Sequence, residues 1–335
     1  MTAKLIPPWI IPDLETYSRL EQGMVTHRPE FAPALVQKQL FADPRLKMSR
    51  KHTVRDYEMG VLSAILEDAR GGFESVLTRV HRPRRGNFST GELLANPYFA
   101  NGTTNWSTAS GGNLALSVID RVMRGYRYAA ASDYKWLAAS FTTVSGNAYV
   151  ARAMVVKGKG AMDYRLQLGT SAGGAELAAD SADNTTSQFR TIVGIATGTT
   201  THFSILDGVD GRSVGDYMEL EYASVARCLQ VDGTVASGLS TIAVDKGDAS
   251  TDGVLKKGDF FEINGEIKMC TAPVNTDVNG KATIRFSPAL VRAAVDNDPV
   301  IIHYPFGKFQ LSNYEEENKF GLQLAISYDL EHIYE

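Results

Sequence analysis

Short alternating runs of apolar and polar residues fill the middle of this chain. Between residues 88 and 228 they occur at 92–99, 114–119, 135–142, 148–156, 164–168, 189–195, 201–206 and 217–225, separated by turns rich in Gly, Asp and Asn. A period of two residues is typical of strands whose two faces meet different surroundings. About eight such strands at regular spacing predict a β-sandwich or jelly roll.

A second, smaller unit of strands follows, from residue 229 to residue 304. Its apolar runs lie at 241–244, 259–263, 266–271, 282–286 and 300–304. Asn264-Gly265 and Asn279-Gly280 are strong hairpin-turn signals, because Asn and Gly tolerate the positive φ angles that tight turns require. We predict that this unit is a small β-barrel-like module.

The first 86 residues have a different pattern, with one helix. Apolar residues recur there at helical spacing, at Val54, Tyr57, Val61, Ile65 and Ala69. This spacing predicts a helix over residues 53–69, with Thr53 as its N-cap and Gly71-Gly72 at its end. Strands are expected at residues 22–28, 34–40 and 73–80.

The last segment returns to strands. Residues 308–311 and 321–333 are predicted strands around an acidic turn at Glu315, Glu316 and Glu317. The longer strand alternates apolar and polar side chains and needs a sheet to join, so we expect the two ends of the chain to pair. The prediction is a mainly β protein. A discontinuous β-sandwich with one helix (1–86 plus 305–335) carries an inserted jelly roll (87–228) and the small β module (229–304).

Composition narrows the class of protein. The chain has 335 residues, 44% hydrophobic and 21% charged, as in soluble globular proteins. A formal net charge of −4 argues against general polyanion binding. No apolar run approaches the roughly 18 residues of a membrane helix, and the start of the chain lacks the pattern of a signal peptide. Cys228 and Cys270 are expected to be reduced thiols, so we expect folding in a cytoplasm.

No catalytic constellation stands out. The six histidines are dispersed, and the chain has neither a phosphate loop nor a spaced metal-ligand motif. We therefore expect no enzymatic activity and no cofactor, with a glycoside hydrolase as the enzymatic alternative. Glu92 and Glu221 are a candidate calcium pair, since hard oxygen ligands suit that cation.

One stretch of aromatic residues offers a candidate carbohydrate-binding surface. Sugars stack their apolar faces on exposed aromatic rings, while polar neighbours bond the hydroxyls. The candidates, in and beside the loop 124–135, are Tyr126, Arg127, Tyr128, Asp133, Tyr134 and Trp136. The alternative is that Trp136 lies in the core and that Tyr126 and Tyr128 are ordinary edge-strand residues. Trp106 is expected to be a structural plug under the first strand.

Three groups of residues are candidates for contacts between subunits: an extended Pro-rich arm, a set of basic residues and the acidic turn. They are Ile6, Pro7, Pro8 and Trp9; Arg50, Arg55, Arg82, Arg84 and Arg85; and Glu315, Glu316 and Glu317. Opposite charges on neighbouring subunits would fix their register in a ring. The alternative is that the basic residues line a lumen through which DNA passes.

The N-terminal block resembles the distal tail protein of long-tailed bacteriophages. The resemblance rests on the early strand from Glu21-Gln22-Gly23 to Arg28, the helix at 53–69, the break at Gly71-Gly72-Phe73 and the returning strands 308–311 and 321–333. It implies a β-sandwich with one helix that forms a hexameric ring between the tail tube protein and the tail-tip hub protein. DNA would pass through the lumen without specific binding. The implied location is the tail tip of the virion, after assembly in the host bacterial cytoplasm.

Two further segments carry resemblances. Residues 255–269 and 277–290 are similar to a small β module of many phage tail proteins. Residues 92–99 with Trp106, and residues 217–225, resemble the first and last strands of jelly-roll carbohydrate-binding modules, although that family commonly has paired acids where this chain has Glu221-Tyr222. Together they imply a structural virion protein whose jelly roll contacts host glycan or anchors a tail fibre. The alternative is a carbohydrate-binding adsorption protein of the tail.

Overall fold

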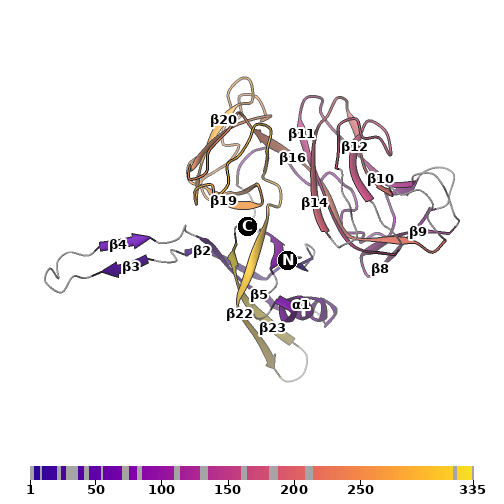
Figure 1. Ribbon diagram of the computed structural model, residues 1–335, viewed down its shortest axis with the longest axis horizontal. Helices are drawn as coiled ribbons and strands as arrows, with labels where there is room; N and C mark the ends of the chain where they lie inside the picture. Colours follow the sequence, from indigo (N-terminus) through magenta and orange to yellow (C-terminus); the bar gives the residue numbers. More distant parts are fainter. Residues whose placement is uncertain are drawn as a thin grey trace.

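The computed structural model is a mainly β protein with one helix among the residues it describes (Figure 1). Those residues are 4–7, 10–20, 24–27, 37–40, 45–53, 56–69, 75–80, 85–108, 114–128, 135–159, 164–180, 188–207, 214–319 and 323–333. Their strands form three larger sheets, largely antiparallel, and one two-stranded ribbon. The predicted fold class is therefore confirmed.

The first sheet joins the two ends of the chain. Its six strands lie in the order β1 (Lys4–Leu5), β6 (Val76–Arg79), β22 (Phe306–Lys319), β23 (Gln323–His332), β5 (Arg45–Thr53) and β2 (Leu14–Leu20). β22 pairs antiparallel with β6, and β23 pairs antiparallel with β5. The late strands therefore find their sheet partners in the N-terminal block, as the sequence predicts.

Alternation along β23 explains how this sheet covers a core. Its buried side chains are Ile326, Tyr328, Leu330 and His332. Helix α1 (Asp56–Ala69) buries Leu62 and Leu66 in the same cluster. These two residues are four positions apart and so lie on one face of the helix.

Several sequence predictions for this domain are corrected by the structure. The helix begins at Asp56, and Thr53 is the last residue of β5 rather than an N-cap. The residues of the predicted acidic turn lie inside β22 instead; they are Glu315, Glu316 and Glu317. Cross-strand pairing with β23 outweighs the low strand propensity of glutamate there. β2 and β5 have no counterpart among the predicted strands.

A two-stranded ribbon extends from this sheet. β3 (Met24–His27) and β4 (Gln37–Leu40) pair with each other and with no third strand among the residues described. They follow from β2 and lead into β5, which are themselves paired. Figure 1 shows the ribbon reaching well away from the rest of the molecule. The strands predicted at 22–28 and 34–40 are confirmed.

The jelly roll consists of two packed sheets. One contains β13 (Ala178–Ala179), β12 (Tyr164–Gly169), β15 (Thr200–Asp207), β10 (Lys135–Thr142) and β7 (Ser107–Thr108). The other contains β14 (Gln188–Ile195), β11 (Ala148–Lys159), β16 (Tyr217–Val231), β9 (Val122–Arg127) and β8 (Leu114–Ile119). Trp106 packs between Phe99 and Phe203 in the core, and its indole N–H donates to the Asn96 carbonyl at 3.3 Å. Trp106 is therefore the plug that the sequence predicts.

The small module closes on itself as a barrel. β16 runs on from the jelly roll, across the boundary predicted between residues 228 and 229. The circuit continues through β17 (Thr241–Asp245), β20 (Ala282–Ser287), β19 (Glu266–Cys270), β18 (Phe260–Ile263) and β21 (Pro299–Ile301), which pairs with β16 again. Asn264 (φ +52°) and Gly265 (φ +76°) connect β18 to β19, so the predicted hairpin turn is confirmed.

One buried ion pair connects all three parts of the chain. Nη2 of Arg152 in β11 lies 2.5 Å from Oε2 of Glu262 in β18. The backbone N–H of Phe306, at the start of β22, donates to the same Oε2 at 2.7 Å. Beside it, an apolar cluster includes Leu5 of β1, Tyr222 of β16 and Phe306. The jelly roll and the barrel are therefore both packed against the six-stranded sheet.

Candidate functional surfaces

Two tyrosines lie side by side on the outer face of the jelly roll. Tyr126 of β9 pairs directly with Tyr217 of β16. Met218, next to Tyr217, is buried in the core, and side chains alternate along a strand, so the two tyrosines face outward. Tyr126 is 39% exposed, and Tyr128, just beyond the end of β9, is 52% exposed.

Arg124 adds charge to the same face. Its guanidinium carbon lies 4.6 Å from the ring centre of Tyr217, and its Nε donates to Oε1 of Glu219 at 2.8 Å. We term Arg124, Tyr126, Tyr128, Tyr217 and Glu219 the tyrosine patch. Exposed aromatic rings beside polar donors and acceptors are the groups with which proteins bind sugars.

The structure brings together only part of the predicted carbohydrate-binding set. Tyr126 and Tyr128 belong to the tyrosine patch. Trp136 lies in β10 of the opposite sheet, half-buried, where a Cβ atom on Gly173 would collide with its ring. Trp136 is therefore not part of the patch. Outside the described residues lie the side chain of Arg127 and all of Asp133 and Tyr134.

Three members of the patch are absent from the predicted set: Arg124, Tyr217 and Glu219. The available signal was local alternation, because Tyr217 and Glu219 flank the apolar Met218. That alternation places Tyr217 and Glu219 on one face, but it does not say that β9 is the neighbouring strand. Pairing between strands distant in sequence was the missing information.

Glu92 is a half-buried carboxylate whose oxygens accept hydrogen bonds from within the protein. Its Oε2 accepts a hydrogen bond from Oγ of Ser224 at 2.6 Å, and its Oε1 accepts the N–H groups of Leu94 and Val225, each at 3.0 Å. Burial raises the pKa of Glu92, and these hydrogen bonds oppose that rise. Glu92 therefore fastens the first segment of the jelly roll to β16.

Glu221, the other half of the candidate calcium pair, lies at a bulge in β16. Met154 pairs with Tyr222, but the next residue, Val155, pairs with Leu220. Burial, and then the charge of Glu219, raise the pKa of Glu221. Within the described part of the chain, no group of three or more His, Cys, Asp or Glu could hold a metal ion. A calcium ion between Glu92 and Glu221 stays a prediction.

Some predicted subunit contacts are already used inside the chain. The buried side chain of Arg50 lies 2.5 Å from Glu15 (Nε–Oε2) and donates to Oγ1 of Thr78 at 2.6 Å. Ile6 and Pro7 are buried, and the N–H of Ile6 donates to the backbone carbonyl of Leu77 in β6 at 2.9 Å. Arg50, Ile6 and Pro7 are therefore covered by their own chain in this structure, and a role for them between subunits stays a prediction.

The remaining predicted contacts are largely untested by the structure. Arg85 is exposed, and its backbone N–H donates to Oδ1 of Asp259 at 2.8 Å. The others lie outside the residues or side chains described: Pro8, Trp9, Arg55, Arg82, Arg84, Glu315, Glu316 and Glu317.

Comparisons with known proteins give fold neighbours of low similarity. No protein-family model matches the chain, and no curated protein matches it significantly. A family 16 carbohydrate-binding module is 11% identical, with 40% of this chain and 98% of that chain covered and a TM-score of 0.29. The K3 cleaved adhesin domain of Lys-gingipain from Porphyromonas gingivalis is 10% identical, with 41% and 99% covered and a TM-score of 0.29.

A third neighbour is the adhesin domain of Epf from Streptococcus pyogenes, 12% identical, with 71% of this chain and 94% of that chain covered and a TM-score of 0.29. TM-scores this low carry no argument about what this chain does. Among the described residues, no helix is long and apolar enough to cross a membrane.

Proposed function

We propose that this chain is a ring subunit at the tail tip of a long-tailed bacteriophage, between the tail tube protein and the tail-tip hub protein. Two features support the proposal: a sheet-and-helix domain closed by both ends of the chain, and the ribbon that leaves it. The jelly roll and the barrel are insertions between β6 and β22 of this domain. The ring would be a hexamer whose lumen passes DNA without specific binding.

The ribbon of β3 and β4 is the observation that carries the proposal. A lone two-stranded ribbon is marginally stable in water, and its open edges favour pairing with another chain. The described part of the structure provides no third strand for it. We infer that the ribbon lies against a second copy of this chain, and head-to-tail contacts of that kind close into rings.

The test is removal of the ribbon. Residues 21–43 are replaced by a short Gly-Ser turn, which keeps β2 and β5 as a hairpin. The variant is expected to fold, by circular dichroism, but to lose the self-association of the intact chain in sedimentation. A control variant carries Asn-Gly in place of Asp120 and Arg121, whose φ angles are already positive, and keeps its oligomeric mass. Equal masses for the ribbon variant and the intact chain would overturn the role of the ribbon.

Contact with host glycan is a second candidate function, favoured by the tyrosine patch. Tyr126 and Tyr217 offer adjacent rings on the outer face, and Arg124 and Glu219 offer donors and acceptors beside them. This arrangement suits stacking against a saccharide on a cell surface. The jelly roll would then provide adsorption while the ring provides assembly.

A glycan array probed with the full-length chain tests this second function. Replacing both tyrosines (Tyr126→Ala with Tyr217→Ala) is expected to weaken binding at least about tenfold, because stacking rings carry much of such an interface. Ile119→Ala, on the same β8–β9 hairpin and 64% exposed, is the matched control and is expected to leave binding unchanged. Binding that survives the double replacement would exclude the patch.

A further inference from the structure

The loop that joins β12 to β13 folds back over the outer face of its own sheet. We term residues 170–176 of this loop the strap. The backbone N–H of Gly173 donates to Oγ of Ser204 in β15 at 2.9 Å. A Cβ atom on Gly173 would lie 2.4 Å from Cδ1 of Trp136 in β10. Since the strand order is β12, β15, β10, the strap reaches across β15 as far as β10.

Trp136 and Ser204 point away from the core of the jelly roll. Leu137, next to Trp136, belongs to the core cluster, as do Phe203 and Ile205 on either side of Ser204. Side chains alternate along a strand, so Trp136 and Ser204 belong to the outer face of this sheet. Ser204 is nevertheless fully buried, and Trp136 is half-buried. The strap therefore covers a part of the outer face that would otherwise meet water.

Few contacts hold the strap in place. Its sequence, Thr-Ser-Ala-Gly-Gly-Ala-Glu, has no large apolar side chain, and each of its residues is exposed or half-buried. In the described part of the chain, the bond from Gly173 to Ser204 is the one hydrogen bond between the strap and a neighbouring strand. Other bonds are internal, such as that from the N–H of Thr170 to Oε2 of Glu176 at 3.2 Å. Segments with few buried apolar contacts open at a lower free-energy cost than the core does.

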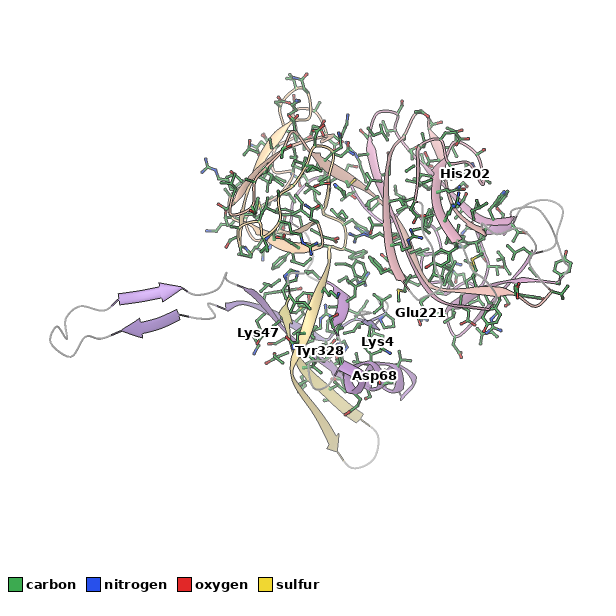
Figure 2. All side chains as sticks on the ribbon, in the orientation of Figure 1. Lys4, Lys47, Asp68, His202, Glu221 and Tyr328 are labelled. Carbon is green, nitrogen blue, oxygen red and sulfur yellow. The ribbon has the colours of Figure 1, made fainter. Side chains whose placement is uncertain are left out.

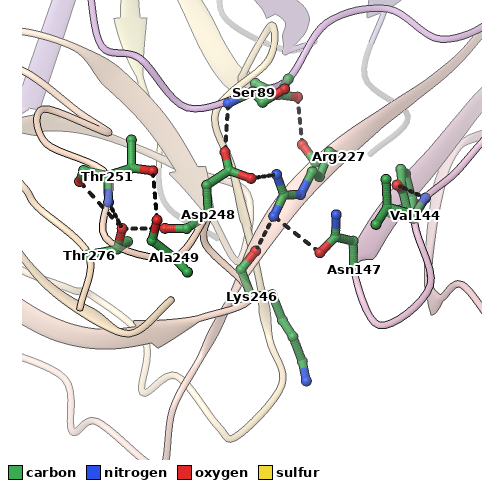
Figure 3. A network of polar contacts seen from close by, with 11 residues as sticks. Ser89, Val144, Asn147, Arg227, Lys246, Asp248, Ala249, Thr251 and Thr276 are labelled. Atoms are coloured by element: carbon green, nitrogen blue, oxygen red, sulfur yellow. Dashed lines mark hydrogen bonds and ion pairs between the residues drawn. The ribbon is translucent and has the colours of Figure 1, made fainter. Parts of the chain in front are cut away.

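The turn between β10 and β11 is held more firmly in the same domain. The N–H of Gly146 donates to the carbonyl of Ala196 at 2.8 Å, and the N–H of Ala196 donates to the carbonyl of Asn147 at 3.0 Å. Oδ1 of Asn147 also accepts a hydrogen bond from Nη2 of Arg227 at 3.2 Å (Figure 3). This turn is therefore fastened to other elements at several points, whereas the strap is fastened at one.

We propose that the strap is a cover that opens and closes over Trp136 while the rest of the jelly roll stays folded. In the closed state, the strap shields Trp136 and Ser204 from solvent. In the open state, it exposes an aromatic ring on β10 and a hydroxyl on the neighbouring strand β15. The strap and the tyrosine patch lie on different sheets of the jelly roll, so opening does not depend on the patch.

Hydrogen exchange of the full-length chain, resolved to single residues, measures the opening. We expect the amide of Gly173 to exchange at least about tenfold faster than the amides of β12, because opening of the strap does not require unfolding of the jelly roll. We also expect it to exchange more slowly than in an unstructured peptide, because the closed strap is the major state. Exchange at the rate of β12 would overturn the opening, and exchange without any protection would overturn the closed state.

Gly173→Ala tests the contact with Trp136. The φ angle of Gly173 is +79°, and the new Cβ would collide with the ring, so the variant is expected to keep the strap open. Acrylamide quenching of tryptophan fluorescence, with and without Trp136→Phe, isolates the signal of Trp136. We expect its quenching constant to rise at least about twofold. The matched control is Gly146→Ala, which has a φ of +85° but no atom within 4 Å of the new Cβ, and it is expected to change nothing.

Ser204→Ala opens the strap without a collision. It removes the acceptor of the strap's hydrogen bond and is expected to speed exchange at the Gly173 amide at least about threefold. Melting curves verify that each variant folds. Unchanged quenching of Trp136 in Gly173→Ala would overturn the proposal, and so would an equal rise in Gly146→Ala, since backbone strain alone would then explain the effect. Unchanged exchange in Ser204→Ala would also contradict it.

Discussion

Burial in the six-stranded sheet lowers the pKa of His52. It is 1% exposed, and its Nε2 lies 3.0 Å from the hydroxyl of Tyr328 on the neighbouring strand. Burial, and then the positive charge of Arg50, lower its pKa from 6.5 to about 4. His52 is therefore a neutral residue of the folded core at pH 7.

This pKa makes stability depend on pH. Because the folded pKa is below the unfolded value, the unfolded chain takes up the proton first as the pH falls. The contribution of His52 to the free energy of unfolding is fully present above about pH 6.5. It is lost as the pH falls toward 4, and the loss is on the order of 1–3 kcal/mol. Urea midpoints at pH 7 and pH 4.5 measure the decline. His52→Gln is expected to reduce it, and an equal decline in the variant would contradict this account.

Arg50 shows why local sequence misleads about single residues. Among neighbouring Lys and Arg it resembles a solvated or interface charge. In the structure it is buried, with Glu15 and Thr78 as partners. Both partners lie far from it in the sequence, so only the assembled sheet reveals that the charge is satisfied internally.

At the scale of elements, the sequence predicts those strands along which apolar and polar residues alternate without interruption. The C-terminal strand was predicted because apolar and polar residues alternate along its length, and it became β23. β5 was missed because its inward positions carry Arg50 and His52 as well as Met48. The tyrosine patch was predicted only in part: β16 was predicted as a strand, but most of β9 fell within the predicted loop 124–135, and the pairing of β9 with β16 was not predicted.

Among the contacts between strands, we expect the ion pair of Arg152 in β11 and Glu262 in β18 to contribute most to stability. Glu262→Gln keeps an acceptor for the N–H of Phe306 but leaves Arg152 as a buried charge without a counter-ion. We expect a loss of about 3 kcal/mol in the free energy of unfolding, typical of breaking a buried pair. Chemical denaturation measures it. The exposed pair of Lys281 and Asp232 is the control, and Asp232→Asn is expected to leave the midpoint unchanged.

The same contact joins the jelly roll, the barrel and the start of β22. If Glu262→Gln shifts the denaturation midpoint no more than the Asp232→Asn control does, the junction is not held by this ion pair. The apolar cluster of Leu5, Tyr222 and Phe306 would then be its main support.

At the scale of the whole molecule, both inserted units lie on one side of the six-stranded sheet, while the ribbon extends away from them (Figure 1). Figure 2 shows the labelled Lys47 and Tyr328 on that sheet and His202 and Glu221 in the jelly roll. In an assembly, the sheet and the ribbon could therefore contact neighbouring subunits at surfaces away from the jelly roll. A ring built through the sheet and ribbon would carry the jelly roll and barrel as attachments.

The oligomeric mass of the full-length chain tests this account most directly. Light scattering across a range of concentrations, with negative-stain imaging of the same sample, determines both mass and shape. We predict a closed ring with the mass of a hexamer. A single-chain mass at every concentration, with no rings in the images, would contradict the proposal that this protein assembles through its ribbon.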